Sequence, residues 1–597
     1  MHWSPMIWVG LACILRICGV ACQTPDSEKL QKAGIKQSEQ DKHRAEQVKA
    51  VFTAAFDDYM KFGFPGDELR PLTKGFRDTR NGWSATLVDS LDTLLVMNLE
   101  DRFKQAVENT LRIDFSHSQT EEGVSIFEST IRYIAGILSA YELSGATNAA
   151  LLDQASKLAD KLLLCWQDDK QNLPFPFIDF ATKKPVNRDF ISAASAGSLI
   201  MEFDRLSFHT RQPKYLQYAT KAIQTVIKTP SLVPGFPGLN YDVKNQTILY
   251  DLATWGAGTD SYMEYLLKYG MLINNTDPSY YNTWKLAVKS SIQELIQVSP
   301  AHNLTYLGEY STMDKTFNYE FSHLACFAGG NWLLGGKVFE DNEVFDYGLK
   351  LVNTCMEAYK RTATGLGPEI FRFLGPNGEI TGDEPGAQDL EFFRANGFYI
   401  SNPVYHLRPE VIESAFYAWR LTGDVQYQEF VWKAFQSLQK YCKAPAGYAE
   451  IQSVNSNSKP NQKDALESFF YSETLKYICL TFSDPGLLSL DEYVFNTEAH
   501  PFHYRGLANF STPTRAPSKG DPPNVEFLGP ALMMESHSSF SPSSQIPAKH
   551  ELDVSRQISR PTGLATTSGY NKPRASCAVR LRRLRTLAPM ESSIRCS

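Results

Sequence analysis

Two kinds of apolar segment alternate along residues 40–500. Segments of the first kind place apolar residues three and four positions apart with polar residues between them, which predicts outer helices with one buried face. These outer segments are 44–62, 101–113, 149–166, 214–227, 280–298, 342–359 and 425–441. Segments of the second kind are apolar around their whole circumference, which predicts fully buried inner helices. These inner segments are 87–97, 127–145, 195–207, 259–270, 323–336, 408–424 and 466–480.

Seven inner helices covered by seven outer helices predict an all-α fold, the (αα)7 barrel. The inner segments start at intervals of roughly forty to ninety residues, which is too irregular for a solenoid of short repeats. Gly and Pro gather in the connecting loops, as in 230–238 and 375–386. We therefore expect one domain over residues 41–503.

The two ends of the chain have a different character. Residues 6–15 are apolar, Arg16 follows, and a small-residue cleavage site ends at Ala21, so we predict a signal peptide over 1–21. A signal anchor is the alternative, but a membrane span needs roughly eighteen apolar residues and no later segment supplies them. We expect no transmembrane anchor, a flexible segment over 22–40, and a location in the lumen of the secretory pathway or outside the cell. The Ser- and Pro-rich basic tail at 504–597 is predicted to be disordered.

Charge is distributed unevenly along the chain, whose net charge is -7. Residues 501–597 carry 13 Lys and Arg against 6 Asp and Glu, whereas the preceding residues carry 46 against 60. An acidic body repels phosphate backbones, so we expect no nucleic-acid partner. The basic run at 574–585 is better explained as a solvated tail than as a polyanion site. An aromatic content of 12% mildly favours a carbohydrate ligand, although a large core is the better explanation.

Cysteines and glycosylation sequons agree with an exported protein without establishing it. The body contains Cys165, Cys326, Cys355, Cys442 and Cys479, which are too sparse for a disulfide scaffold and lack zinc-site spacing. Asn-x-Ser/Thr sequons occur at Asn245, Asn274, Asn303 and Asn509. They are usable only in the secretory pathway.

The inner segments are unusually rich in acidic residues. They hold, or lie beside, Asp89, Asp92, Glu128, Glu202, Asp260, Glu264, Glu410, Glu413, Glu467, Glu473 and Glu498. Each carboxylate alone is readily explained as a helix cap or an ion-pair partner. Burying so many is costly unless something binds them, which indicates an acidic cavity for a hard cation, a polyhydroxylated substrate and paired acid-base chemistry. Glycoside hydrolysis uses such a pair of carboxyl groups.

Seven motifs resemble, in order, those of the class I α-1,2-mannosidases, glycoside hydrolase family 47, and most closely its secreted fungal members. They are GWSATLVDSLDTLLVM (82–97), FESTIR (127–132), TDSYMEYLLK (259–268), HLACFAGG (323–330), LRPEVIES (407–414), ESFFYSETLKY (467–477) and VFNTEAHPF (494–502). The resemblance implies an (αα)7 barrel, a bound Ca²⁺ and hydrolysis of α-1,2-linked mannose with inversion. The implied partners are high-mannose N-glycans on glycoproteins, and we expect a monomer.

The resemblance also assigns roles to individual residues. Glu128 matches the general acid, Glu410 the general base, and Asp260 a third catalytic carboxylate whose role is divided between acid and support. Thr497 matches the calcium ligand, through its hydroxyl and carbonyl oxygens. The implied substrate-binding residues are Arg132, Glu202, Glu413, Phe469, Glu473 and Glu498. Without the resemblance, Arg132 could equally form a helix ion pair with Glu128, and Phe469 could be ordinary core.

Two further expectations come from the resemblance. Cys326 and Cys355 match a family disulfide, worth about 3 kcal/mol in the chain-entropy model, which leaves Cys165, Cys442 and Cys479 free and buried. Gly258 stands where family members that remove a single mannose tend to have Arg, so Gly indicates the trimming of several mannoses. The competing hypothesis is a mannosidase-like lectin that binds the same glycans with little turnover. Retention of Glu128, Asp260 and Glu410 favours the enzyme.

Overall fold

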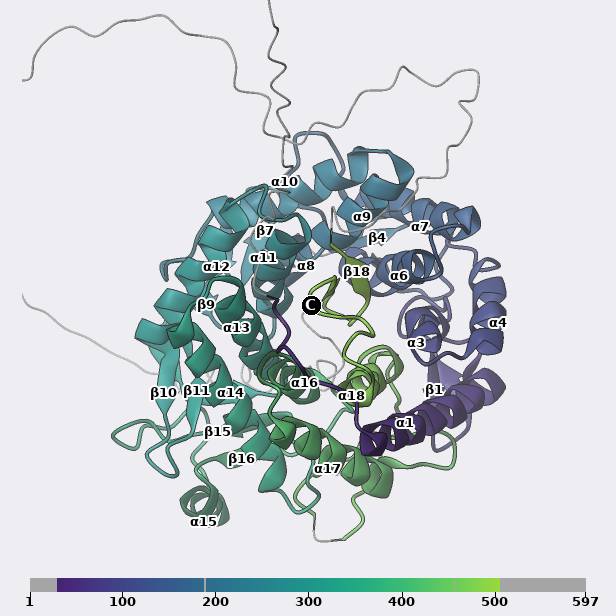
Figure 1. Ribbon diagram of the computed structural model, residues 1–597. Coiled ribbons are helices and arrows are strands. Elements are labelled where there is room, and N and C mark those ends of the chain that lie inside the picture. The colour runs from purple at the N-terminus through teal and green to yellow at the C-terminus, as the bar shows by residue number, and fades with distance from the viewer. Residues whose placement is uncertain (1–28, 187–188, 457, 505–597) are drawn as a thin grey trace, which may run out of the picture. The chain divides into compact units, whose positions relative to one another are not determined.

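The computed structural model describes residues 29–186, 189–456 and 458–504 (Figure 1). These residues form two compact units. Within these residues, unit 1 consists of 29–108, Gln297–Tyr306 and Glu320–His503, and unit 2 of Asn109–Ile296, Leu307–Tyr319 and Tyr504. The predicted signal peptide at 1–21, Asn509 and nearly all of the 504–597 tail lie outside the described residues. None of the described helices is long and apolar enough to cross a membrane.

Unit 1 contains the first and the last helices of the described chain. Its helices are α1 (Glu39–Asp58), α2 (Ala85–Asp89), α3 (Leu91–Val96), α13 (Phe327–Val338), α14 (Asn342–Lys360), α15 (Ala387–Asn396), α16 (Glu410–Thr422), α17 (Val425–Cys442) and α18 (Leu475–Phe482). Shorter π or 3-10 turns are η1 (Tyr59–Gly63), η5 (Leu324–Cys326) and η6 (Phe470–Thr474). Its strands are β1 (Glu68–Arg70), β2 (Gly75–Arg77), β14 (Glu320–Ser322), β15 (Ile370–Arg372), β16 (Tyr399–Asn402), β17 (Tyr493–Phe495) and β18 (Pro501–His503).

Unit 2 contains the middle part of the chain. Its helices are α5 (Ile126–Glu128), α6 (Ala135–Leu143), α7 (Ala149–Leu162), α8 (Ala193–Gly197), α9 (Ile200–Thr210), α10 (Lys214–Lys228), α11 (Asp260–Leu272) and α12 (Ser279–Ser290), with the turns η2 (Ser129–Ile134), η3 (Leu163–Cys165) and η4 (Ser291–Leu295). Its strands are β3 (Val124–Ser125), β4 (Phe177–Asp179), β5 (Lys184–Pro185), β6 (Phe190–Ser192), β7 (Asn240–Asp242), β8 (Ile248–Tyr250), β9 (Leu252–Ala253), β12 (Glu309–Ser311) and β13 (Thr316–Asn318). The chain passes between the units within α4 (Glu100–Thr110), β10 (Ile296–Val298) and β11 (Thr305–Leu307), and again after Tyr319.

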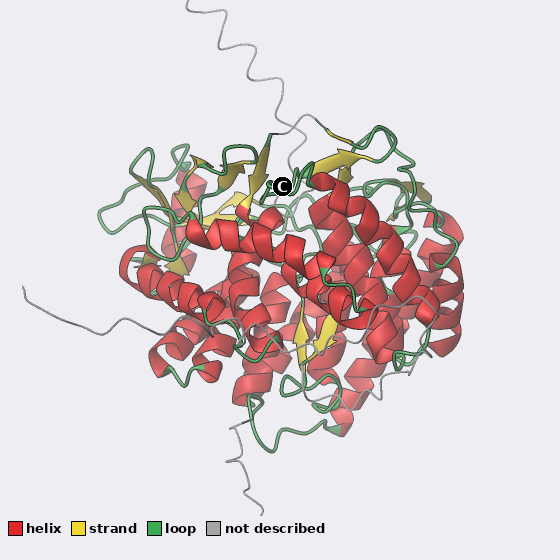
Figure 2. Cartoon of the chain, turned by 90° about the horizontal axis from the view of Figure 1, so that it is seen from above, coloured by secondary structure: helices red, strands yellow, loops and turns green. Residues whose placement is uncertain are grey.

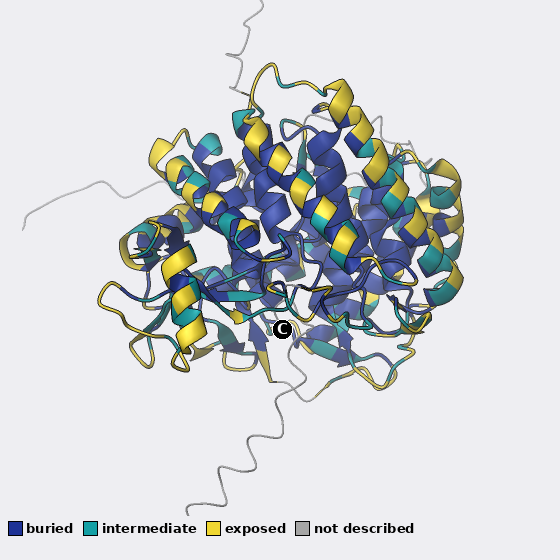
Figure 3. Ribbon diagram, turned by 90° about the horizontal axis from the view of Figure 1, so that it is seen from below, coloured by how far each residue is buried: buried dark blue, intermediate teal, exposed yellow. Residues whose placement is uncertain are grey.

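The two kinds of helix differ in burial as their sequences predict (Figure 3). Every residue of the inner helix α11 is buried. The outer helix α10 buries Tyr215, Ala219, Ala222, Ile223 and Val226, which recur three or four positions apart along one face. Inner and outer helices that follow one another pack together, as α9 with α10, α11 with α12, α13 with α14 and α16 with α17. Within unit 1, the first outer helix α1 packs against the last inner helix α18.

The chain forms short antiparallel sheets of two or three strands (Figure 2). Strands of these sheets precede several inner helices in the sequence. β3 leads directly into α5, β6 into α8, and β14 closely precedes η5. The sequence did not reveal these strands, because two to four residues are too few to show an alternating pattern. The prediction that the outer segment 280–298 is helical to its end is wrong. Helix α12 ends at Ser290, the π turn η4 follows, and Ile296–Val298 is the strand β10.

The N-terminal part of the described chain is tied to unit 1. Gln31 Nε2 donates hydrogen bonds to Ser489 Oγ at 2.9 Å and to the Pro485 carbonyl at 3.2 Å. The buried Arg420 guanidinium donates to Gln31 Oε1 at 2.7 Å. Ser38 then caps α1, with Asp41 completing a capping box, so this helix begins five residues before the predicted segment.

Candidate active site

In unit 2, a carboxylate and a guanidinium lie in direct contact near the start of an inner helix. Ser125 ends β3 and caps α5, accepting the Glu128 N–H at 3.2 Å. The π turn η2 follows at once and places Arg132 Nε 2.7 Å from Glu128 Oε2. Both side chains are buried. An arginine at this distance stabilises the charged form of the carboxylate and holds it in one orientation.

Glu202 and Asp260 lie on neighbouring inner helices of the same unit. α9 packs against both η2 and α11, and Glu202 on α9 accepts the Tyr265 hydroxyl of α11 at 2.6 Å. Asp260 is the first residue of α11, and its Oδ1 accepts the Ser261 N–H at 2.7 Å. In unit 2 the helices that carry Glu202 and Asp260 therefore pack together, and the helix of Glu202 also packs against the turn that follows Glu128.

Gly258 occupies a backbone conformation that side chains rarely adopt. Its φ is +94°, and a Cβ built on it would lie 2.6 Å from Leu239 Cδ1. The Gly258 carbonyl accepts the N–H of Ala194 at the start of α8. A larger residue would be strained here and would press on Leu239, so the local fold itself favours glycine.

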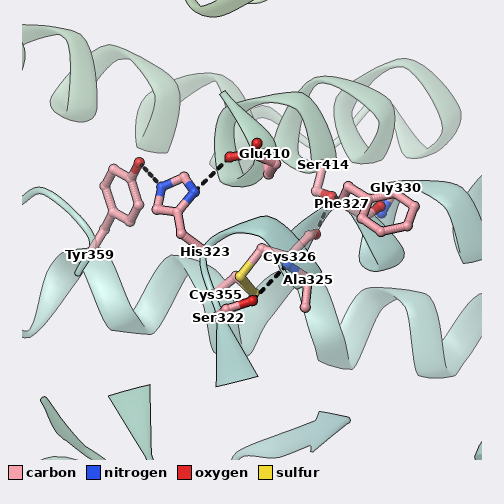
Figure 4. The surroundings of a disulfide bond; sticks show 10 residues. All are labelled: Ser322, His323, Ala325, Cys326, Phe327, Gly330, Cys355, Tyr359, Glu410 and Ser414. Carbon is pink, nitrogen blue, oxygen red and sulfur yellow. Dashed lines mark hydrogen bonds and ion pairs between the residues drawn. A yellow bond between two sulfur atoms is a disulfide. The ribbon is translucent and has the colours of Figure 1, made fainter. Parts of the chain in front are cut away.

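In unit 1, Glu410 begins α16 and is held by a histidine (Figure 4). His323 lies between Glu410 and Tyr359, with Nδ1 2.8 Å from Glu410 Oε2 and Nε2 2.8 Å from the Tyr359 hydroxyl. Burial raises the pKa of Tyr359, so its hydroxyl keeps its proton and can donate to Nε2. The imidazole can then donate from Nδ1 to the Glu410 carboxylate. A hydrogen bond donated to the Glu410 carboxylate favours its ionised form, which is the form that a general base needs.

The other predicted residues of unit 1 lie on packed elements around α16. Glu413 accepts the Tyr477 hydroxyl of α18 at 3.2 Å, and the Arg408 guanidinium stands 5.8 Å from the centre of the Phe469 ring. Glu473 is on the π turn η6, which packs against α16 and α18. Thr497 and Glu498 lie in the turn between β17 and β18, where the Glu498 N–H donates to Asn496 Oδ1 at 2.9 Å. All of these acidic side chains are buried.

Several acids of the inner segments have cationic partners within hydrogen-bond distance. Asp89 and Asp92 contact His500, and Asp92 also contacts Lys476. Glu264 pairs with Lys268 one helical turn away, and Glu467 pairs with Arg77. For these four carboxylates, the structure confirms the simpler explanation that each is the ion-pair partner of a nearby cation.

The sequence did not identify His323 or the pair Arg408–Glu369 as functional candidates. Arg408 Nε lies 2.9 Å from Glu369 Oε2. Partial burial of Glu369 alone would raise its pKa, but the charge of Arg408 and its neighbours holds that pKa below its usual value. His323 and Arg408 do occur in the motifs HLACFAGG and LRPEVIES. Nothing in either string indicates which distant residue its side chain contacts.

Comparison with known proteins identifies the family. The profile of glycosyl hydrolase family 47 matches residues 51–504. The probable mannosyl-oligosaccharide α-1,2-mannosidase 1B of Aspergillus clavatus is 36% identical over 510 residues, covering 81% of this chain and 97% of that protein. The mannosyl-oligosaccharide α-1,2-mannosidase 1B of Aspergillus oryzae is 36% identical over 487 residues, covering 78% and 93%. The chain belongs to glycosyl hydrolase family 47.

A similar solved structure confirms the fold. The α-1,2-mannosidase from Trichoderma reesei matches with a TM-score of 0.74 and 33% identity, covering 78% of this chain and 99% of that one. The fold class is therefore the all-α (αα)7 barrel that the alternation of inner and outer segments predicts. The family match begins within α1 and ends at Tyr504, the last described residue.

The disulfide expected from the family 47 resemblance is present. Cys326 of η5 and Cys355 of α14 are bonded, with Cα atoms 6.0 Å apart (Figure 4). Cys165, Cys442 and Cys479 are free and buried, as predicted. Ser414 Oγ on α16 donates to the Cys326 carbonyl at 2.7 Å. The disulfide thus lies on the turn that follows His323 and is linked to the helix that begins with Glu410.

The three sequons within the described residues have exposed asparagines, at Asn245, Asn274 and Asn303. Asn245 lies in the β7–β8 turn, and Asn274 lies just after α11. Glycosylation at these positions remains an expectation. Their exposure is what attachment of a glycan requires.

The calcium ion that family 47 implies would be held mainly by oxygen atoms of Thr497 and by water. Among the described residues, no group of three or more His, Cys, Asp or Glu side chains is arranged to hold a metal ion. A site centred on Thr497 is of a different kind, because a hydroxyl and a carbonyl supply its protein ligands. These are hard oxygens of the type that Ca²⁺ prefers, and the buried carboxylates of Glu413, Glu473 and Glu498 occur in the same unit. The residues present therefore fit the ion chemically.

Proposed function

We propose that this protein is a calcium-dependent exo-α-1,2-mannosidase that trims high-mannose N-glycans with inversion of configuration. The observation that carries the proposal is the match of family 47 to residues 51–504, together with the placement of Glu128, Asp260 and Glu410 in the first turns of buried helices. The named relatives in Aspergillus are mannosyl-oligosaccharide α-1,2-mannosidases. We expect the protein to act as a monomer in the secretory pathway or outside the cell.

The proposed mechanism uses the carboxyl groups in separate roles. Glu128 serves as the general acid that protonates the leaving oxygen, and Glu410 serves as the base that activates water. The hydrogen bond from His323 supports the role of Glu410, because a donor to the carboxylate favours its ionised form. Asp260 supports the reacting centre from the start of α11. Bound calcium would supply a fixed positive charge that holds sugar hydroxyls and waters.

The remaining buried groups are proposed to bind the mannose. Arg132 orients Glu128 and contacts substrate, and Phe469 offers a ring face of the kind on which sugars pack. Glu202, Glu413, Glu473 and Glu498 accept hydrogen bonds from sugar hydroxyls or from calcium-bound waters. We further propose that the protein removes several mannoses, because Gly258 stands where family members that remove a single mannose tend to have Arg.

Mass spectrometry of a nine-mannose N-glycan incubated with the purified protein tests the proposal. We expect stepwise loss of four hexoses down to the five-mannose product, abolished by a chelator and restored by calcium. Loss of a single hexose would contradict the argument from Gly258. Binding of an unchanged glycan would show a lectin instead of an enzyme. NMR observation of the first-released sugar as β-mannose would support inversion, and release of α-mannose would contradict it.

A further inference from the structure

Four ionisable side chains meet in the interior of unit 1, apart from the proposed catalytic carboxylates. Asp89 ends α2, Asp92 lies in α3, Lys476 lies in α18 and His500 immediately precedes β18. All four residues are 0% exposed. His500 Nδ1 lies 2.9 Å from Asp92 Oδ2, and its Nε2 lies 3.0 Å from Asp89 Oδ1. Lys476 Nζ lies 2.9 Å from Asp92. We call these residues the buried charge cluster.

The cluster is balanced in charge. Both ring nitrogens of His500 face carboxylate oxygens, so the ring donates both hydrogen bonds when it is an imidazolium, the form that its raised pKa favours. Two cations then offset two carboxylates. Although burial opposes both shifts, the cationic neighbours lower the pKa of Asp92 to about 2, and the carboxylates raise the pKa of His500. Because isolated buried charges are strongly disfavoured, removal of one member destabilises the positions of the others.

The cluster is attached to the turn that contains Thr497. Lys476 Nζ donates to the carbonyl oxygen of Ala499 at 2.6 Å, and His500 is the next residue. Within the turn, Asn496 Oδ1 accepts the N–H groups of Glu498 and His500 at 2.9 and 2.8 Å. Ala499 is held at φ +60°, a conformation that a non-glycine residue adopts only when its surroundings impose it. Thr497 therefore lies in a turn fixed internally by Asn496 and externally by the cluster.

A second connection leads from the cluster to the proposed sugar-binding floor. Ser468 Oγ donates to Asp89 Oδ2 at 2.5 Å. Ser468 immediately precedes Phe469, which caps the π turn that carries Glu473. The same buried charges thus connect the Thr497 turn with the backbone of Phe469.

We propose that the buried charge cluster of Asp89, Asp92, Lys476 and His500 positions the Thr497 oxygens for calcium. These are positioning residues, since they act through the turn and do not touch the ion or the substrate. The inference rests on the calcium dependence proposed above. It adds that calcium affinity depends on the four charged residues of the cluster, which do not themselves bind the metal.

The test measures calcium affinity by isothermal titration calorimetry on the purified full chain, with the melting temperature in chelator measured in parallel. The variant His500→Gln removes the imidazolium and leaves two carboxylates facing one lysine. We expect its Kd for calcium to rise by about 10- to 100-fold, the range typical of lost outer-sphere partners of a metal site. The matched control is His209→Gln. His209 lies in unit 2 with its side chain 7% exposed, and it contacts Glu142 at 2.8 Å in a similar imidazole–carboxylate–guanidinium group with Arg205.

The control separates positioning from general destabilisation. We expect His209→Gln to lower the melting temperature in chelator and to leave the calcium Kd at the parental value. A parental Kd in His500→Gln would overturn the inference, and so would an equal rise in Kd in the control. If His500→Gln does not fold, Asp89→Asn is the deciding variant, because it removes one charge and keeps the shape of the side chain. Absence of calcium binding by the parent protein would overturn the calcium proposal and this inference together.

Discussion

At the scale of single residues, the proposed role of Glu410 as the base leads to a direct prediction. Glu410→Gln should reduce the rate of mannose release by about 100- to 10 000-fold, the range associated with a lost general base. Because glutamine has the same shape and can still contact His323, we expect folding to be preserved, which thermal unfolding would check.

Glu429→Gln is the matched control for this substitution. Glu429 lies on the outer helix α17 and pairs with Arg44 at the surface of unit 1. Mannose release by this variant should equal that of the parent. Near-parental turnover by Glu410→Gln would exclude Glu410 as the base.

The local sequence predicts some contacts of the catalytic candidates and not others. Glu128 and Arg132 are four positions apart, so their contact follows from the helix period. Glu410 and His323 are separated by 87 positions, and only the packing of η5 against α16 brings them together. The same holds for Asp92 and Lys476, which are 384 positions apart.

At the scale of elements, ion pairs attach the β1–β2 hairpin to Glu467, which lies shortly before η6. Arg77 of β2 lies 2.7 Å from both Glu68 of β1 and Glu467, and Arg80 lies 3.6 Å from Glu467. Burial, reinforced by the nearby charge of Glu467, raises the pKa of Glu68 from 4.5 to about 8 despite the two arginines. Short strands that the sequence did not predict therefore contain a group that titrates near neutrality.

The raised pKa of Glu68 predicts a specific pH dependence of stability. The folded state binds this proton more tightly than the unfolded state, so its stabilising contribution is full below pH 4.5 and is lost as the pH rises to about 8. Glu68→Gln mimics the protonated form at every pH. We expect the melting temperature of the variant, relative to the parent, to increase steadily between about pH 5 and pH 8.5 in differential scanning fluorimetry. Parallel curves for the two proteins across this range would contradict the prediction.

At the scale of the whole molecule, we expect the proposed binding of calcium to be coupled to folding. The residues proposed to surround the ion come from η6, α16 and the β17–β18 turn, which are brought together only in the folded chain. A ligand that binds only the folded state stabilises it, by about 2.7 kcal/mol when its concentration is 100 times its Kd.

This coupling predicts how the whole protein responds to the metal. Calcium should raise the melting temperature of the parent protein, and Thr497→Ala should lose most of this increase. Thr512→Ala, at a position beyond the matched family region, serves as the control and should respond like the parent. Equal melting temperatures of the parent with calcium and with chelator would contradict the prediction.

The sequence by itself determined the inner and outer helices, the family and the identities of the acidic residues. Helical period and burial are local properties, so each segment carries them in its own residues. The tertiary structure decided which buried acids pair with cations, as Asp89 and Asp92 do with His500, and where histidine supports a carboxylate, as His323 does for Glu410. It also decided the short strands and π turns that place the helix starts. These features depend on contacts between distant residues, whose energies exist only when the chain is packed.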